Sequence, residues 1–376
     1  MDAQGRRLAQ FLERALRPSV SVGGRAISTF HLFGGLGFAA AIACGLVLGA
    51  RLGLSPAVIG ALAAASSVSS LALVLLVRAL LGEERLVYYH HELAVLIVVG
   101  LAAAALGRLP LPYLDVSTLA LGLLLACGRL GCLMVGCCHG LPHRFGLRYR
   151  VEHGDAGLAR GWVGVPLLPV QAVESVAVLA LTLAAAARLT HRPPGATLAG
   201  QVVAYALLRF GLEQLRGDGA RPQLGGLSEA QLTSTGLAIL TVLAERIGWL
   251  PASAWHPFAA AALVLACATV GLARRGPHQR LLSARHVEEL AEALLAARDP
   301  VAPGAAPRVC TTSLGVRLSS GRVTEERGET RLYTFSGVDA RAARALSSLI
   351  LDLQHHAGGC RLAEPRPGVF QLLLFP

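Results

Sequence analysis

The chain has 376 residues, of which 54% are hydrophobic and only 15% are charged, and its mean hydropathy is +0.56. Soluble domains hold about 25% charged residues, so this composition excludes an ordinary soluble protein and predicts an integral membrane protein. All 34 basic residues are arginine, and the net charge of +11 suits contact with anionic membrane lipid. No basic stretch is interleaved with aromatic residues, which argues against nucleic acid as a partner. The eight cysteines do not form the pattern of a secreted disulfide framework.

We expect residues 1–27 to form an N-terminal segment at the membrane interface. They carry charge throughout and lack a short apolar core followed by a small-residue cleavage site, so we expect no signal peptide. Leu8, Leu12 and Leu16 recur every four residues, which predicts a short interfacial helix.

Residues 28–276 predict an all-α polytopic membrane domain with seven or eight transmembrane helices. The expected spans are about 30–50, 57–77, 93–106, 116–135, 165–187, 196–215 and 258–272. The third is short unless it extends back through Tyr88 and His90. A further apolar run, 232–243, is too short to span comfortably and predicts a re-entrant segment or half of a bent helix. Arg274, Arg275 and Arg280 favour a cytoplasmic C-terminal part.

The composition changes near residue 277 and predicts a small soluble α+β domain at the C-terminus. Residues 277–307 are expected to supply an amphipathic helix, 281–297, and a proline-rich linker, 299–307. In the domain itself, 308–376, we expect strands over 309–318 and 322–335 on either side of Ser-Ser-Gly, a helix over 339–356 and a strand over 368–375. His355 and His356 are interpreted as surface residues, and nothing in this domain predicts catalysis.

The most informative stretch runs from Cys127 to Gly140, at the end of an apolar segment. A charged side chain near the bilayer centre costs about 2.5–3.5 kcal/mol on insertion scales. We therefore interpret Arg129 as a functional residue. The structural alternative is an arginine that snorkels from its helix end to the interface. Gly131 and Gly140 belong to a set of glycines that weaken a helix and allow close approach. The stretch predicts a site for an anionic lipid headgroup.

Four residues of this stretch are also candidate metal ligands. Zinc and other soft metal ions bind cysteine and histidine side chains, and the stretch holds Cys132, Cys137, Cys138 and His139. The spacing is not Cys-x-x-Cys, and adjacent cysteines on a membrane helix point about 100° apart. We therefore expect no metal site and interpret the cysteines mainly as small buried apolar residues.

Arg209, Glu213 and Arg216 are spaced i, i+4 and i+7 near the end of another apolar segment. This spacing predicts one helical face, on which a single carboxylate orders two guanidinium groups. One positive charge remains and would attract a phosphodiester. The alternative is a structural ion pair at a helix end.

Two weaker polar clusters lie at the starts of apolar segments. Gln171 and Glu174 are one helical turn apart, which fits either a polar site or favourable electrostatics at a helix N-terminus. His90 follows Tyr89 and precedes His91-Glu92. A histidine there has a pKa near working pH and is a candidate general base, unless the cluster is an interfacial aromatic belt.

Taken in order, these motifs resemble the prolipoprotein diacylglyceryl transferase family of bacterial membranes, over about residues 28–245. The resemblance is carried by Gly128-Arg129-Leu-Gly131, Pro169-x-Gln171-x-x-Glu174, Arg209-Phe-x-x-Glu213-x-x-Arg216-Gly-Asp218 and Leu227-Ser-x-x-Gln231. It implies a multi-pass protein of the bacterial cytoplasmic (inner) membrane. Its activity would be transfer of diacylglycerol from phosphatidylglycerol to the lipobox cysteine of a prolipoprotein signal peptide, with release of glycerol phosphate and no cofactor.

The resemblance also implies residue roles. Arg129 and Arg209 would hold the phosphate, Glu213 would orient arginine, and His90 matches an important histidine of the family. The remaining residues expected at substrate-binding positions are Arg216, Gln171, Glu174, Gly131, Gly140 and Cys132.

The chain departs from the family pattern at four places. Cys132 stands where the family usually has asparagine, and Cys137 where it often has glutamate. Leu168 replaces a histidine, and His91-Glu92 replaces Gly-Gly. Two alternatives therefore stay open: a related phospholipid-dependent transferase with another acceptor, and a non-catalytic lipid-binding membrane protein.

Overall fold

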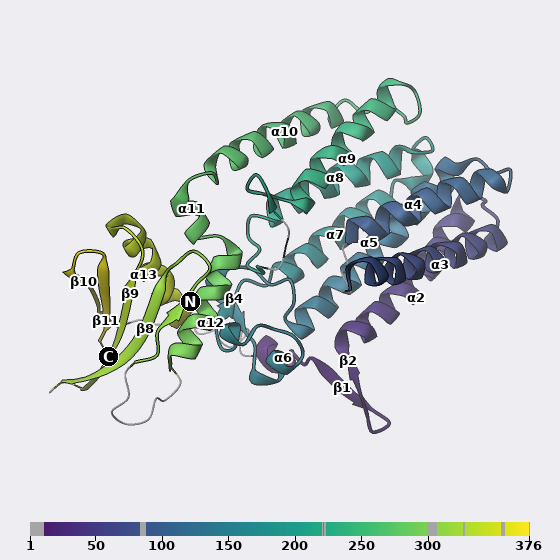
Figure 1. Cartoon of the computed structure of the whole chain (residues 1–376). Coiled ribbons are helices and arrows are strands. Elements are labelled where there is room, and N and C mark those ends of the chain that lie inside the picture. Colours follow the sequence, from purple (N-terminus) through teal and green to yellow (C-terminus); the bar gives the residue numbers. More distant parts are fainter. Residues whose placement is uncertain are drawn as a thin grey trace.

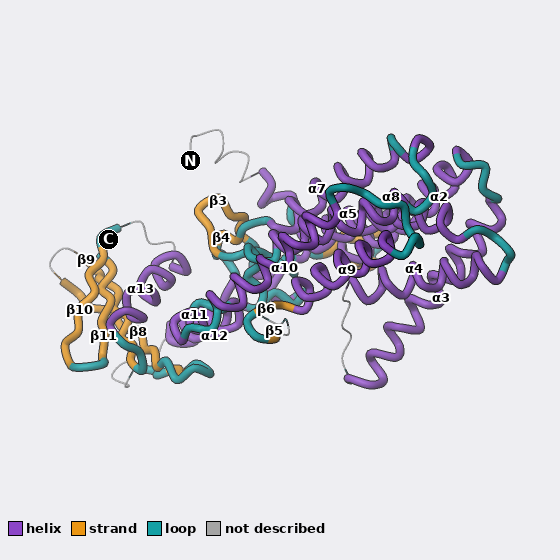
Figure 2. Tube along the Cα trace, turned by 90° about the horizontal axis from the view of Figure 1, so that it is seen from above, coloured by secondary structure: helices purple, strands orange, loops and turns teal. Residues whose placement is uncertain are grey.

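The computed structural model describes residues 11–82, 88–219, 221, 223–298, 307–325, 328–354 and 358–375. Long helices gather at one end of the molecule, and a small sheet with one helix on it forms the other end (Figures 1 and 2). The two ends meet through short strands, loops and helix α12. The predicted domain boundaries stay a prediction.

Eight helices follow the apolar segments closely. They are α2 (Thr29–Arg51), α3 (Pro56–Leu81), α4 (Tyr88–Ala105), α5 (Pro110–Val135), α7 (Val170–Ala186), α8 (Ala196–Leu212), α9 (Glu229–Arg246) and α10 (His256–Ala273). Among the described residues α2, α3, α5 and α10 are long and apolar enough to cross a membrane, while α4, α7 and α8 are shorter apolar helices. The expected count of seven or eight spans stays a prediction.

Helix α5 begins at Pro110, six residues before the expected start at 116, and two further helix boundaries also differ from the sequence prediction. The run 232–243 is the middle of the 18-residue helix α9, which begins at a capping box formed by Ser228 and Gln231. The prediction was too short because both ends of α9 are polar. Residues 165–169, expected at the start of a span, instead include strand β4 (Pro166–Leu167), which pairs with β3 (Pro142–Arg148).

Helix α5 is the centre of the helical part, because α2, α4, α7 and α8 all pack against it. Glycines permit the close approach of α2. A Cβ atom on Gly131 would lie 3.2 Å from the Cα atom of Phe30, and one on Gly37 would lie 2.7 Å from the Cβ atom of Cys127. Small residues at a helix crossing allow this contact in membrane proteins. It fixes α5, which carries Arg129, against the start of α2.

The N-terminal segment is only partly as expected. Residues 11–15 are helical and Leu16 is buried, whereas Leu8 lies outside the described residues. A hairpin of β1 (Ser19–Val22) and β2 (Arg25–Ser28) follows, which the sequence analysis did not predict. The polar loop after α5 contains α6 (Val151–Asp155) and a 3-10 turn, η1 (Arg160–Trp162), in addition to β3 and β4.

The C-terminal part is a five-stranded antiparallel sheet in the order β10-β11-β9-β8-β7. Its elements are β7 (Cys310–Thr311), β8 (Arg317–Glu325), β9 (Gly328–Ser336), α13 (Ala340–Gln354), β10 (Cys360–Arg366) and β11 (Val369–Leu374). The expected turn at Ser-Ser-Gly is wrong, because Ser319–Gly321 lie inside β8 and pair with β9. β10 was not predicted, and His355 and His356 lie outside the described residues.

Helix α12 (Ala284–Arg298), preceded by α11 (Pro277–Leu281), joins the sheet to the helical part. Its apolar residues share a core with Trp162 of the polar loop and with Val316 and Leu318 near β8. Two of its carboxylates accept backbone hydrogen bonds, Glu288 from the N–H of Gly219 and Glu292 from that of Gly161, both at 2.8 Å. The amphipathic helix expected over 281–297 is therefore present as α12, and it is packed on both sides.

Candidate functional site

A cavity of about 1080 Å³ lies among α2, α3, α4, α5, α8 and α9. Six of the predicted site residues line it: His90, Arg129, Cys132, Arg209, Glu213 and Arg216. Phe38, Ile42, Leu62 and Val116 are among the apolar residues on its other walls. The cavity thus joins a charged wall to an apolar one, as a phospholipid requires for its headgroup and acyl chains.

Glu174 links the two arginines that the sequence analysis placed at the phosphate. Its Oε2 atom lies 2.8 Å from Nε of Arg129 and 3.3 Å from Nη1 of Arg209. Tyr205 donates a hydrogen bond of 2.9 Å to the other carboxylate oxygen. Glu174 is 1% exposed. Helices α5, α7 and α8 each bring one charged group to this point, so residues far apart in the sequence form one buried cluster.

The ion pairs continue beyond α8. Glu213 lies 3.0 Å from Nη2 of Arg209 and also pairs with Nη1 of Arg221. Arg221 reaches Asp218 at 3.2 Å, and Asp218 binds Arg216 through two hydrogen bonds of 2.8 and 2.9 Å.

The prediction that Arg209, Glu213 and Arg216 share one helical face is wrong for Arg216, because α8 ends at Leu212. Glu213 does lie between two guanidinium groups, but the second belongs to Arg221.

The seven side chains form an alternating series, which we call the arginine–carboxylate chain: Arg129, Glu174, Arg209, Glu213, Arg221, Asp218 and Arg216. Four arginines and three carboxylates leave one positive charge. Burial, and then the positive charge of Arg209, lowers the pKa of Arg221 to about 10, so this group still carries its proton at neutral pH. A buried cluster with surplus positive charge favours an anion next to it.

Gly140 joins the end of α5 to the segment that follows α8. It forms a β-bridge with Arg216, while the N–H of Leu141 donates to the carbonyl of Leu215 at 2.9 Å. A Cβ atom on Gly140 would lie 2.6 Å from Cγ2 of Val170. Glycine is therefore required here for backbone approach, and this contact places Arg216 at the cavity.

Four residues predicted at substrate-binding positions lie behind the cavity wall: Gly131, Gly140, Gln171 and Glu174. Gly131 packs on Phe30, and Gln171 donates a hydrogen bond of 2.7 Å to the carbonyl oxygen of Cys137. Glu174 holds Arg129 and Arg209. In the structure these residues contact the side chains and backbone that line the cavity.

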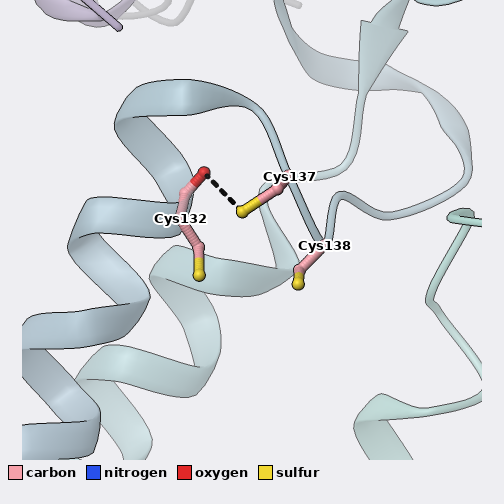
Figure 3. Close-up of side chains that lie close together, drawn as sticks. All are labelled: Cys132, Cys137 and Cys138. Atoms are coloured by element: carbon pink, nitrogen blue, oxygen red, sulfur yellow. Dashed lines mark hydrogen bonds between the residues drawn. The ribbon is translucent and has the colours of Figure 1, made fainter. Parts of the chain in front are cut away.

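Cys132, Cys137 and Cys138 converge on one point of the cavity wall (Figure 3). Their three Sγ atoms all lie within 4.8 Å of one another. The expectation that adjacent cysteines diverge on a helix does not apply, because α5 ends at Val135. Hydrogen bonds from the Cys132 and Cys137 thiols, and then the charges of Arg216 and Arg129, hold the pKa of Cys138 well below its usual value despite burial.

His90 faces the same cavity from the first turn of α4. Its Nε2 atom lies 2.6 Å from Oε1 of Glu229, the first residue of α9, and both side chains are partly exposed. A carboxylate in this position orients the imidazole. The imidazole of His90 is the group that a general base requires, and the carboxylate of Glu229 holds it in place.

A family model described as prolipoprotein diacylglyceryl transferase matches residues 37–245. The chain belongs to the prolipoprotein diacylglyceryl transferase family. This confirms the resemblance drawn from the motifs. No curated protein matches the chain. The family and the apolar helices together establish a multi-pass membrane protein of a transferase family that serves lipoprotein biosynthesis.

The match to the prolipoprotein diacylglyceryl transferase family covers the arginine–carboxylate chain and ends within α9. The C-terminal sheet lies outside the matched residues. Three residues with direct contacts at the site were not predicted from the sequence, namely Tyr205, Arg221 and Glu229. Arg221 stands three residues after Asp218, a spacing that signals an ion pair on a turn, whereas no local pattern connects Glu229 with His90.

Proposed function

We propose that the chain transfers a diacylglyceryl group from phosphatidylglycerol to the lipobox cysteine thiol of a prolipoprotein in the bacterial cytoplasmic membrane. The observation that carries the proposal is the arginine–carboxylate chain, with its surplus positive charge, whose arginines line a cavity that has a large apolar wall. Membership of the prolipoprotein diacylglyceryl transferase family supports the reaction class.

In this proposal the lipid phosphate lies against Arg129 and Arg209. Both side chains line the cavity, and both are held by Glu174 from behind. Guanidinium groups with fixed orientation bind phosphate oxygens through paired N–H donors. The acyl chains then occupy the apolar part of the cavity, beside residues such as Phe38 and Leu62.

The reaction displaces a phosphate from a glycerol carbon. The acceptor thiolate attacks the diacylglyceryl carbon that carries the phosphate oxygen, an S–C bond forms, and the C–O bond breaks. The phosphate oxygen takes the electron pair, and glycerol phosphate leaves. Because negative charge grows on that oxygen in the transition state, preoriented arginines lower the barrier.

The acceptor must lose its thiol proton before or during attack, because the thiolate is the nucleophile. His90 is the proposed general base, and Glu229 is its positioning residue. Both side chains line the cavity that holds Arg129, so the base and the phosphate site face one space.

A second candidate function is phospholipid-dependent transfer to a different acceptor. The observation that favours it is a second cavity, of about 840 Å³, between α12 and the segment around Gly219. Arg221 lines both cavities, and Cys310 and Thr311 of β7 line the second one. A C-terminal domain that shares a wall residue with the lipid site offers a place for another acceptor.

The test uses the purified full-length chain in vesicles of phosphatidylglycerol with a lipobox peptide. We expect a peptide whose mass rises by one diacylglyceryl group in a thioether, together with one glycerol phosphate per modified peptide. The same peptide with serine in place of cysteine is the control. Consumption of phosphatidylglycerol without peptide modification would favour the second candidate, and intact lipid with folded protein would contradict both.

A further inference from the structure

The three-thiol cluster of Cys132, Cys137 and Cys138 has the spacing of a metal site. All its Sγ atoms lie within 4.8 Å of one another. A tetrahedral zinc ion with Zn–S bonds of about 2.3 Å places its sulfur ligands about 3.8 Å apart. The thiols therefore need to approach by about 1 Å at most, which rotation about their χ1 bonds supplies.

The backbone that carries the cluster is already held in place. Gly136 takes a left-handed conformation at the end of α5, and its N–H donates to the carbonyl of Cys132 at 3.0 Å. Gln171 fixes the carbonyl of Cys137. Cys138 has a φ of 58° and is the one non-glycine residue with positive φ in the described part of the chain. Such strained conformations concentrate at functional sites, because the surrounding structure must hold them.

The charge around the cluster suits a zinc–thiolate centre. Zn²⁺ with three thiolates carries a net charge of −1, whereas the three thiolates alone would carry −3, so the ion removes most of the negative charge beside the site proposed for the lipid phosphate. Arg129 and Arg216 line the same cavity as the three cysteines. Three sulfur ligands also select a soft or borderline ion over magnesium or calcium. Zinc is one such borderline ion, and it has no redox chemistry that would oxidise the thiols.

Among the described residues no fourth histidine, cysteine or carboxylate joins the three thiols, so the fourth coordination position is left to the cavity. His139, a neighbouring candidate ligand, points its Nδ1 atom at the carbonyl of Gly140 at 2.9 Å and packs its ring on Trp162. All three cysteines line the lipid cavity. Three protein ligands with an open fourth position are the arrangement of a catalytic zinc site, whereas structural sites are closed by four.

We propose that Cys132, Cys137 and Cys138 bind Zn²⁺, and that the acceptor thiol occupies the fourth position as a thiolate. This inference rests on the proposed function and adds a means of activating its nucleophile. The acceptor loses its proton to a base in the cavity, for which His90 is the candidate, as its sulfur binds the zinc. The sulfur then forms the S–C bond while the C–O bond breaks toward phosphate. The thioether product is neutral and a weaker ligand, so it leaves the metal.

The first test measures metal content. We expect the full-length chain, purified with Zn²⁺ supplied, to retain about one zinc per chain, and the triple variant C132S/C137S/C138S to retain none. Cys127→Ser is the matched control, because Cys127 lies on α5 but does not line the cavity. Equal zinc in the wild type and the triple variant would overturn the inference. So would a metal-free wild type whose mass is two hydrogens lower, which indicates a disulfide.

The second test needs no variant. The wild type is loaded with Co²⁺, and the sulfur-to-cobalt charge-transfer band and the visible bands of a tetrahedral site are recorded. We expect the lipobox peptide to change these bands and the serine peptide to leave them unchanged. A cobalt spectrum that ignores the thiol peptide would overturn the open fourth position.

The outcomes separate this inference from the proposed function. Diacylglyceryl transfer at wild-type rate by the triple variant would overturn the zinc site and leave the transferase intact. Bound zinc and a cobalt spectrum that responds to the thiol peptide, without any transfer from phosphatidylglycerol, would support the metal site and overturn the transferase.

Discussion

Nε of Arg129 lies 2.8 Å from Oε2 of Glu174, and the same carboxylate holds Arg209. This shared partner brings arginines from α5 and α8 to one wall of the cavity. Because the three side chains are almost completely buried, the carboxylate compensates the cost of removing two guanidinium groups from water. Its loss should therefore affect both folding and lipid binding.

Replacing Glu174 by glutamine is expected to destabilise the chain strongly. Removing one partner of a buried ion pair costs about 3–5 kcal/mol, because the other charge stays buried without compensation. We expect a lower free energy of unfolding in detergent and at least a tenfold loss of turnover. Glu152→Gln is the control, since its pair with Arg150 is about half exposed and contributes about 1 kcal/mol or less. Equal stability of the two variants would show that Glu174 does not anchor the arginines.

Gly140→Ala is expected to disturb the site without removing any charged group. The new Cβ atom would meet Cγ2 of Val170 at 2.6 Å and the carbonyl oxygen of Leu168 at 2.7 Å, so the bridge to Arg216 must shift. We expect lower turnover and a reduced melting temperature, as for other substitutions that overpack a core by about 1–3 kcal/mol. Gly60→Ala on α3, where a Cβ atom has open space, should be neutral or stabilising. Equal turnover and equal melting temperatures for the two variants would show that the backbone contact at Gly140 does not position Arg216.

His90→Asn is expected to lower kcat by about 100-fold, the lower end of the range for general base catalysis. The loss should shrink as pH rises toward the ordinary thiol pKa of about 8.5, because the acceptor then ionises without a base. Glu229→Gln should give a smaller loss in kcat with little change in KM, because Glu229 acts through His90. His191→Asn, exposed at the 3-10 turn η2 (Leu189–His191), is the control. A loss that is the same at every pH would exclude His90 as the base.

The sequence predicted the parts of this structure that depend on local pattern. Apolar length located the eight helices, and charged residues in apolar segments identified Arg129 and Arg209 before any contact was known. The predicted length of α9 was too short for a local reason. Its first and last residues are polar, so apolar length alone misses them, although a capping box at Ser228 marks where the helix begins. The β1–β2 hairpin and β10 were missed because short exposed strands carry little periodic signal.

The site depends on contacts that no local pattern encodes. Arg221 replaces Arg216 as the second partner of Glu213 because the chain leaves the helix after Leu212 and turns back. The three thiols meet because α5 stops at Val135 and the next residues reverse direction. The docking of α12 through Glu288 and Glu292 is likewise a long-range result: the sequence predicted the amphipathic helix but not its partners.

The most direct test of the central claim is the rate at which Arg129→Gln releases glycerol phosphate from phosphatidylglycerol in the presence of the lipobox peptide. Removing one preoriented donor from a developing anion costs about 100- to 1000-fold in turnover. We predict a loss of this size in protein that still folds, with a lower melting temperature because the buried carboxylate of Glu174 keeps only Arg209 as an arginine partner. Arg51→Gln, at the exposed end of α2, should keep wild-type turnover. Turnover by folded Arg129→Gln within twofold of wild type would contradict the account.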